Sequence, residues 1–213
     1  MALNSPLFDE KNALIKRVFD LSLICLTFPI LFPFMLFIWV ILKATGVNSP
    51  IFSQKRIGLN GKKFSFFKFR TMVKDADAIL KTWIADHPDI KTEFEEKFKL
   101  RGDPRITYFG KFLRRTSLDE LPQIFNIIKG DMSLVGPRPI VQDEISKYGT
   151  HVDDVFRVKP GLSGLWQVSG RNDVSYERRI ELDLEYLKKW SIWLDFVILF
   201  KTFRAALDGK GAY

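Results

Sequence analysis

Apolar residues form two long runs, one near each end of the chain, with a mixed apolar and polar segment between them. The first run, residues 21–42, reads LSLICLTFPILFPFMLFIWVIL and contains no charged residue. A straight helix of that length would reach roughly 33 Å, close to the ~30 Å hydrocarbon thickness of a bilayer. The pattern therefore predicts a membrane helix.

Prolines and flanking charges argue against a simple spanning helix. Pro29 and Pro33 lie inside the run, where proline removes a backbone donor and kinks or breaks a helix. Cations flank both ends, and no acidic residue occurs between residues 43 and 70. Because cationic flanks prefer the cytoplasmic side, a re-entrant helix that bends at a proline and returns to the same face satisfies both ends. A spanning helix remains the alternative.

Residues 190–207, WSIWLDFVILFKTFRAAL, form the second run. Asp195, Lys201 and Arg204 interrupt it, and its two tryptophans lie at one end. These features suit a helix that lies in the headgroup zone of a membrane. An ordinary core helix explains the same pattern equally well.

Between the runs, the pattern predicts a helix-rich α+β fold with one or two small β elements. β-branched and aromatic residues on both sides of Asn60-Gly61 predict a hairpin over residues 51–69 with a primed turn. Residues 75–100 predict two helices separated near Pro88. Further helices are expected in residues 107–115, 145–149 and 176–190.

Composition narrows the range of functions. The net charge of +8 suits an anionic partner, such as nucleic acid, acidic lipid headgroups or a phosphorylated small molecule. Cys25 is the only cysteine, so no intrachain disulfide can form. His87 and His151 are the only histidines, and neither adjoins a plausible nucleophile. A Ser-His-Asp site or a histidine-rich zinc site is therefore not expected.

Residues 117–120, SLDE, place the carboxylates of Asp119 and Glu120 among cations. In one interpretation they begin a helix, since S-x-x-E is the spacing of a capping box and acidic residues stabilise a first turn. In another, which does not exclude the first, the pair holds Mg²⁺ as hard oxygen ligands. Arg114 and Arg138 would then bind phosphate oxygens. An aspartate in such a setting can itself attack phosphorus, and a phosphoryl-transfer site at a membrane also accounts for the apolar runs and the basic charge.

The motifs around this pair closely resemble those of the bacterial sugar transferases, the monotopic phosphoglycosyl transferases. The resemblance rests on RRTSLDELPQIFNIIKGDMSLVGPRP, on KRVFD, FSQKRIGLNGKKFSFFKFRTM and DPRIT before it, and on VKPGLSGLWQVSGRN and GKGAY after it. It covers nearly the whole chain from about residue 15. The chain looks most like the undecaprenyl-phosphate galactose or glucose phosphotransferase branch.

The resemblance implies an activity and a set of site residues. Enzymes of this kind transfer a sugar phosphate from a UDP-sugar to undecaprenyl phosphate and release UMP, at the cytoplasmic face of the bacterial inner membrane. Asp119 matches the family's nucleophile, and Glu120 matches its partner carboxylate at Mg²⁺. The matching phosphate-binding and basic positions are Arg114, Arg138, Lys68 and Arg70.

The resemblance also implies an organisation of the chain. We expect an N-terminal segment over residues 1–15, a re-entrant membrane helix over 16–44, and a cytosolic sugar-phosphate transferase domain over 45–213 with a small hairpin and C-terminal interfacial helices. Pro33 matches the family's helix-breaking proline, although Phe32 stands where some members have serine. Larger members carry extra spanning helices and a regulatory domain, so the chain is expected to be a minimal member or a trimmed catalytic part.

The expected partners are a UDP-sugar, undecaprenyl phosphate and membrane lipids, but no nucleic acid, and a homodimer is one open oligomeric state. The expected sugar is galactose or glucose, in the first membrane step of exopolysaccharide, capsule or O-antigen synthesis, with an N-acetylated sugar as the alternative. A rival of another class is a non-enzymatic basic membrane adaptor, which leaves SLDE and GPRP unexplained. A polytopic one-step enzyme would need more apolar segments than this chain has.

Overall fold

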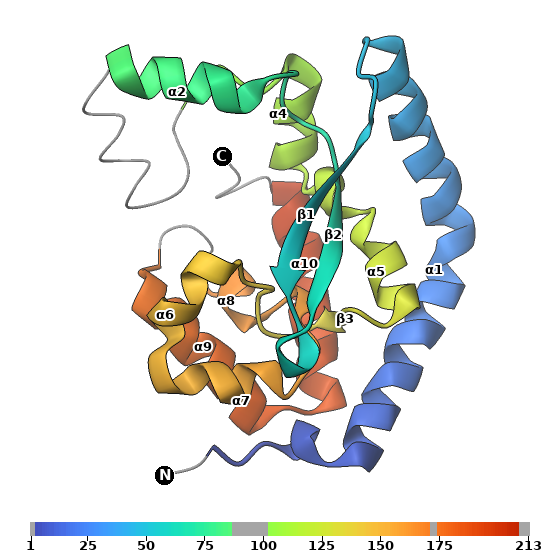
Figure 1. Cartoon of the computed structure of the whole chain (residues 1–213). Helices are drawn as coiled ribbons and strands as arrows, with labels where there is room; N and C mark the ends of the chain where they lie inside the picture. Colours follow the sequence, from blue (N-terminus) through green and yellow to red (C-terminus); the bar gives the residue numbers. More distant parts are fainter. Residues whose placement is uncertain (1–2, 87–101, 171–173, 209–213) are drawn as a thin grey trace.

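The computed structural model describes residues 3–86, 102–170 and 174–208. One long helix, α1 (Glu10–Ala44), runs along the outside of a helix-rich α+β domain (Figure 1). The remaining main elements are β1 (Ile51–Ile57), β2 (Lys63–Phe69), α2 (Ala76–Asp86), α4 (Tyr108–Arg115), α5 (Gln123–Lys129), β3 (Ser133–Val135), α6 (Ile145–Tyr148), α7 (Val152–Phe156), β4 (Gly161–Ser163), α8 (Leu165–Val168), α9 (Tyr176–Lys189) and α10 (Ile192–Asp208). The second helix expected before residue 100 lies outside the described residues.

Helix α1 begins earlier than predicted because Asp9 caps it. The Asp9 carboxylate accepts hydrogen bonds from the backbone N–H groups of Lys11 and Asn12. The helix is continuous through Pro29 and Pro33, so the helix break predicted at Pro33 does not occur. Instead its axis bows, with the concave side toward the hairpin (Figure 1). Prolines inside a helix bend it in this way because each removes one backbone hydrogen bond.

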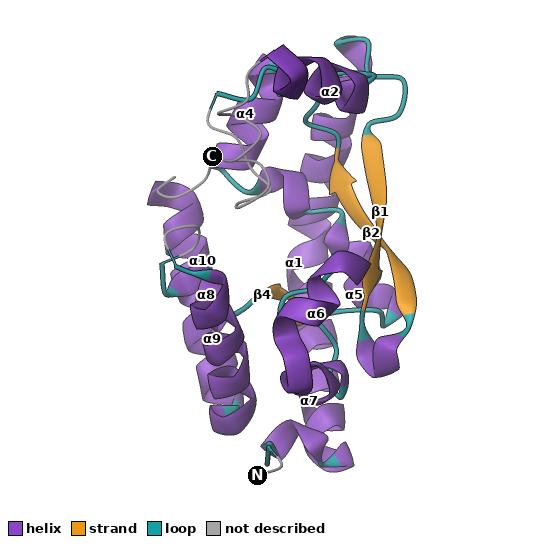
Figure 2. Ribbon diagram, turned by 60° about the vertical axis from the view of Figure 1, so that its left-hand side comes forward, coloured by secondary structure: helices purple, strands orange, loops and turns teal. Residues whose placement is uncertain are grey.

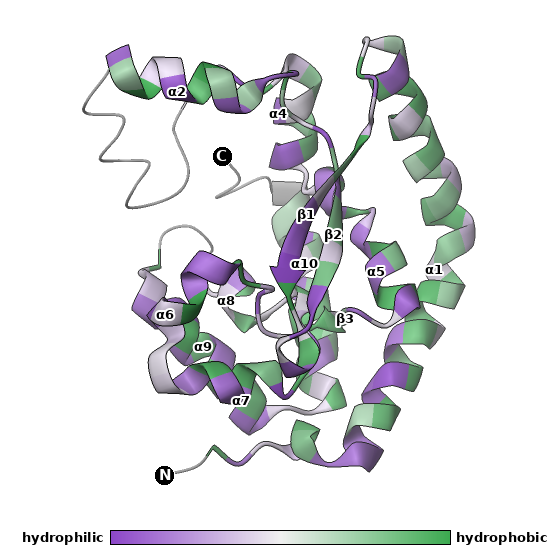
Figure 3. Cartoon of the chain, viewed as in Figure 1, coloured by the Kyte–Doolittle hydropathy of each residue, from purple (hydrophilic) through white to green (hydrophobic). Residues whose placement is uncertain are grey.

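Both halves of α1 contact the domain. In the first half, Lys16 pairs with the buried carboxylate of Asp195 on α10 at 2.5 Å, and Asp20 accepts a hydrogen bond from Ser133 on β3 at 2.6 Å. In the second half, the buried side chains of Met35, Ile38 and Leu42 join Phe69 and Leu113 in a small apolar cluster. The outward face carries exposed apolar side chains, including Leu26, Ile30, Phe34, Phe37 and Val40 (Figure 3). Such a large exposed apolar face is typical of contact with lipid or another protein.

Strands β1 and β2 form the predicted antiparallel hairpin, in which Ile51 pairs with Phe69 and Ile57 with Lys63. Asn60 and Gly61 both have positive φ, as a primed turn requires, but they belong to a longer connection over residues 58–62 that contains a 3₁₀ turn. The hairpin lies between α1 and the helices at the left of Figure 1.

A second, parallel pair was not predicted. Strands β3 and β4 pair Ser133 with Gly161 and Val135 with Ser163, and α6 and α7 lie in the connection between them. Three-residue strands are too short to leave an alternating pattern in the sequence. In Figure 1, α6 and α8 lie on the side of the domain opposite α1, and in the turned view of Figure 2 α6 is drawn in front of α1.

Helix α10 combines the two interpretations of its sequence. Asp195 and Ile198 are fully buried against the domain, as in a core helix. The opposite face exposes a set of aromatic side chains, as in an interfacial helix: Trp193, Phe196, Phe200 and Phe203.

Candidate active site

The acidic pair lies in a tight turn between α4 and α5. Ser117 ends the α4 segment in the left-handed region, with φ of 57°, and a 3₁₀ turn over Leu118–Glu120 follows. The Ser117 side chain makes no cap hydrogen bond, so the capping box suggested by the S-x-x-E spacing does not form. A left-handed conformation is costly for serine, and such strain is characteristic of positions that aim a functional side chain.

Helix α5 holds this turn against the hairpin. The side chain of Asn126 accepts a hydrogen bond from the backbone N–H of Phe67 at 3.1 Å and donates one to the carbonyl of Ser65 at 2.6 Å. These two bonds lie immediately before Lys68 on β2. Asn126 thus holds β2, which carries Lys68, against α5, which follows the acidic pair.

Lys68 pairs with both carboxylates. Its Nζ atom lies 2.7 Å from Glu120 Oε1 and 3.9 Å from Asp119 Oδ2. Asp119 is 8% exposed, whereas the side chain of Glu120 reaches solvent. The two adjacent acids therefore differ in environment, with the first enclosed and the second open.

Burial raises the pKa of Asp119 to about 6, and the neighbouring charge of Glu120 acts in the same direction. Lys68 and Arg114 oppose this shift by stabilising the carboxylate. At neutral pH the side chain is thus an ionised but poorly solvated carboxylate. Desolvation of this kind makes an oxygen nucleophile more reactive than one in water.

Arg114 lies on the other side of Asp119. Its Nε atom donates a hydrogen bond to the Thr71 hydroxyl at 2.9 Å, and its charge acts on Asp119. Burial lowers the pKa of Arg114. The packing of α4 against the backbone at Thr71 needs glycine at position 110, because a Cβ there would collide with the carbonyl oxygen of Thr71.

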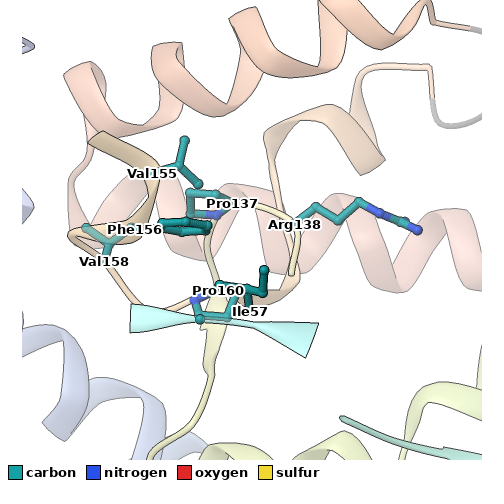
Figure 4. Close-up of a pocket in the computed structure, with 8 residues that line it drawn as sticks. Ile57, Pro137, Arg138, Val155, Phe156, Val158 and Pro160 are labelled. Carbon is teal, nitrogen blue, oxygen red and sulfur yellow. The ribbon is translucent and has the colours of Figure 1, made fainter. Parts of the chain in front are cut away.

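Arg138 belongs to a second cationic region beside the acidic turn. Its charge acts on the buried carboxyl of Asp183, and its guanidinium group lies over the ring of Trp166 at 5.4 Å. Figure 4 shows its side chain extending away from the apolar cluster of Pro137, Val155, Phe156, Val158 and Pro160. The prolines on either side fix the loop, as expected from GPRP.

Arg56 links the two regions and was not among the predicted site residues. It donates a hydrogen bond to the carbonyl of Pro139 at 3.1 Å, and its charge interacts with Arg138 and with Glu120. The sequence showed it only as one of many cations after the apolar run.

Arg70 points elsewhere. Its Nε atom donates to the carbonyl of Ser49 at 2.8 Å, and its guanidinium group lies over the ring of Phe52. These contacts place it at the end of the hairpin near the C-terminus of α1. Its predicted role on the basic side of the site stays a prediction.

The residues fit Mg²⁺ only in combination with a substrate. Within the described part of the chain, no group of three or more His, Cys, Asp or Glu side chains could hold a metal ion. Asp119 and Glu120 supply two hard oxygen donors, and Mg²⁺ commonly takes one or two carboxylates together with substrate phosphates. Glu120 would have to exchange its contact with Lys68 for the ion.

An apolar helix packed along an α+β domain, with a buried aspartate among lysine and arginine side chains, is typical of a membrane-associated protein with a site for an anionic substrate. A model of the bacterial sugar transferase family matches residues 11–209, and the chain belongs to this family.

Named relatives agree with this assignment. Undecaprenyl-phosphate galactose phosphotransferase of Salmonella typhimurium is 46% identical over 214 residues, which cover 100% of this chain and 44% of that protein. Exopolysaccharide production protein ExoY of Rhizobium meliloti is 43% identical over 198 residues, 93% of this chain and 88% of that protein. UDP-glucose:undecaprenyl-phosphate glucose-1-phosphate transferase of Klebsiella pneumoniae is 36% identical over 222 residues, 98% of this chain and 44% of that protein. The chain thus spans less than half the length of the first and third of these relatives.

Proposed function

We propose that the protein transfers a hexose 1-phosphate from a UDP-sugar to undecaprenyl phosphate at the cytoplasmic face of the bacterial inner membrane, and that the transfer passes through Asp119. The observation that carries the proposal is the buried Asp119 carboxylate between Lys68 and Arg114. The names of the relatives supply the sugar phosphate and the lipid acceptor.

In the first step, a carboxylate oxygen of Asp119 attacks the phosphorus atom that carries the sugar. A bond forms between that oxygen and phosphorus, and the bond from phosphorus to the bridging oxygen breaks, so that UMP leaves. In the second step, a phosphate oxygen of the lipid attacks the same phosphorus and releases Asp119. The product is undecaprenyl diphosphate sugar, and the aspartate is regenerated.

Lys68 and Arg114 would neutralise the phosphoryl oxygens during both steps, which is the main assistance that phosphoryl transfer needs. Mg²⁺ bound at Asp119 and Glu120 would add Lewis-acid charge to the diphosphate. The turn from Ser117 to Glu120 fixes the position of the attacking oxygen, so its strained backbone serves the chemistry.

The contacts of α1 support a monotopic arrangement. A helix that crossed the bilayer would place its two ends on opposite sides, yet the same domain packs against residues near both ends of α1. Lys16, Arg17 and Lys43 would all remain at the cytoplasmic face in a re-entrant arrangement, as the charges require.

A trapping experiment tests the chemistry. Incubation of the protein with UDP-galactose or UDP-glucose and Mg²⁺, without lipid, should release UMP and add one hexose phosphate to the peptide that contains Asp119. Asp119→Asn should abolish both events, and Glu120→Gln should reduce the metal-dependent rate. Added mass on another peptide, or turnover by Asp119→Asn, would show that the covalent step is wrongly assigned.

A further inference from the structure

Buried polar atoms without hydrogen-bond partners gather on the side of the domain that carries Arg138. Five such atoms belong to the GPRP loop, α8 and α9: Arg138 Nε, Trp166 Nε1, Gln167 Oε1, Arg179 Nε and Asp183 Oδ1. Leaving a buried donor or acceptor unpaired costs free energy, so such groups are rare in folded proteins. A concentration of them indicates a place where a polar ligand completes the hydrogen bonding.

The two guanidinium groups in this cluster share one aromatic ring. The central carbon of Arg138 lies 5.4 Å from the centroid of Trp166, and that of Arg179 lies 4.9 Å from it. Neither side chain makes a hydrogen bond or an ion pair with a described residue. Trp166 holds the two groups by cation–π contacts, which leave their N–H donors available.

The neighbouring residue shows what an ordinary surface arginine does in the same helix. Arg178 is 52% exposed in its side chain and pairs with Glu181 at 2.7 Å. Arg179, one position further, turns inward to Trp166, where Arg138 is the neighbouring cation. The two adjacent arginines thus have different roles although the sequence presents them as one basic pair.

A third arginine, Arg56, adds to the charge. Burial and the charge of Arg138 lower the pKa of Arg56 to about 10, and burial followed by the charge of Arg138 also lowers that of Arg179. Glu144 lies 3.5 Å from Arg56, and the buried carboxyl of Asp183, whose pKa burial raises to about 7, interacts with the charges of Arg138 and Arg179. These two acidic groups only partly offset three arginines, and an anion would balance the remaining positive charge.

We infer that Arg138, Arg179 and Arg56 form a subsite, built around Trp166, for the phosphate that leaves with the nucleoside of a sugar-nucleotide donor. The inference rests on the proposed function for the identity of the donor. The free guanidinium N–H groups of Arg138 and Arg179 suit a phosphate, because each guanidinium group can donate two parallel hydrogen bonds. Arg56 and Lys68 lie over the same Phe66 ring, at 5.6 and 5.4 Å, so the subsite adjoins the acidic turn that Lys68 contacts.

The position of the subsite favours the water-soluble donor over the lipid. Figures 1 and 2 place α6 and α8 on the side of the domain away from α1 and its exposed apolar face. A lipid phosphate would approach from the apolar side, where its chain can remain in the bilayer. A nucleotide would approach from the opposite, aqueous side.

Binding of UMP to the full chain, measured by titration calorimetry without any sugar or lipid, tests the subsite apart from catalysis. Arg179→Gln should weaken UMP binding by about tenfold or more, as expected for loss of a charged hydrogen bond. Arg178→Gln is the matched control and should bind UMP as the unsubstituted protein does. Uridine, which lacks the phosphate, should show no difference between the two variants. In turnover assays, Arg179→Gln should raise the KM for the UDP-sugar and leave the KM for undecaprenyl phosphate unchanged.

The outcomes separate the two proposals. Equal UMP affinity in Arg179→Gln and Arg178→Gln, or no UMP binding by the unsubstituted protein, would overturn the subsite. A raised KM for the lipid phosphate instead of the donor would assign these arginines to the acceptor and also overturn it. If no UDP-sugar is turned over but Arg179→Gln still loses UMP binding, the subsite stands and the proposed reaction fails.

Discussion

Asp119 illustrates, at the scale of one residue, how burial of a carboxyl group lowers the stability of the folded protein at neutral pH. The folded chain raises the pKa of this carboxyl from 3.8 to about 6, with burial as the main cause. Between these values the folded protein holds a proton that the unfolded chain releases. The contribution of Asp119 to stability therefore falls as pH rises from about 4 to about 6, and above that the ionised form is a constant cost.

We therefore expect Asp119→Asn to abolish transfer but to raise the free energy of unfolding at pH 7. A two-unit shift corresponds to at most ~3 kcal/mol, and the remaining pair of Lys68 with Glu120 leaves a gain on the order of 1–2 kcal/mol. Denaturant unfolding of both proteins in detergent, at pH 4 and pH 7, measures this change in the free energy of unfolding. The gain should be present at pH 7 and absent at pH 4. If Asp119→Asn is less stable at pH 7, the favourable contacts of the Asp119 carboxylate outweigh the cost of its desolvation.

The activity of the unsubstituted protein should follow the same ionisation. Attack needs the carboxylate form, so the rate of UMP release should rise through about pH 6 and level off above it. Initial rates at UDP-sugar concentrations well below KM, from pH 5 to pH 8, give the profile of kcat/KM, which reports ionisation in the free protein. A rate that is flat across this range would mean that the titration of Asp119 does not limit the reaction.

At the scale of elements, α1 exposes a large apolar face and buries both apolar and charged side chains. Its buried positions include Lys16 and Asp20, which are paired with Asp195 and Ser133, while large apolar side chains face outward. A buried charge needs such partners, and a lipid-facing surface needs no polar groups. Within residues 21–42 both the buried and the exposed faces are apolar, so the run has little helical periodicity to show which face is buried.

Labelling of single cysteines tests the arrangement of α1. In a Cys25→Ser background, cysteines at Asn4 and Asn48 should both react with a membrane-impermeant thiol reagent only from the cytoplasmic side. Pro33→Leu restores the missing hydrogen bond and should move the helix toward spanning, with Asn48 labelled from the other side in part of the molecules. Labelling of the unsubstituted pair from opposite sides would contradict the re-entrant arrangement.

At the scale of the whole molecule, the expectation for the sugar rests on the names of two relatives. One is named for galactose transfer and the other for glucose transfer, and the chain covers less than half of each. We expect UMP release with UDP-galactose or UDP-glucose and little with UDP-N-acetylgalactosamine. Robust turnover of the N-acetylated donor alone would reverse this assignment, while the site around Asp119 would keep its role.

Local sequence patterns were sufficient to predict many of the secondary-structure elements of this protein. The apolar run, the hairpin, the helices of α4, α9 and α10, and the acidic pair beside cations are all local patterns, because helix and strand periodicities repeat over a few residues. The family resemblance assigned Asp119, Glu120, Arg114 and Arg138 on motifs alone. The sequence also predicted positive φ at Asn60 and Gly61, since local turn chemistry favours them there.

Other features depend on contacts between segments far apart in the chain. Lys68 meets Glu120 only because Asn126 ties β2 to α5, and the Ser117 cap fails because tertiary packing holds the turn left-handed. Arg178 and Arg179 are indistinguishable by type, but successive residues in a helix point about 100° apart, so one reaches solvent and the other Trp166. Residue type and spacing were sufficient to propose the acidic pair as a candidate site, whereas packing determined which of the many cations stand around it.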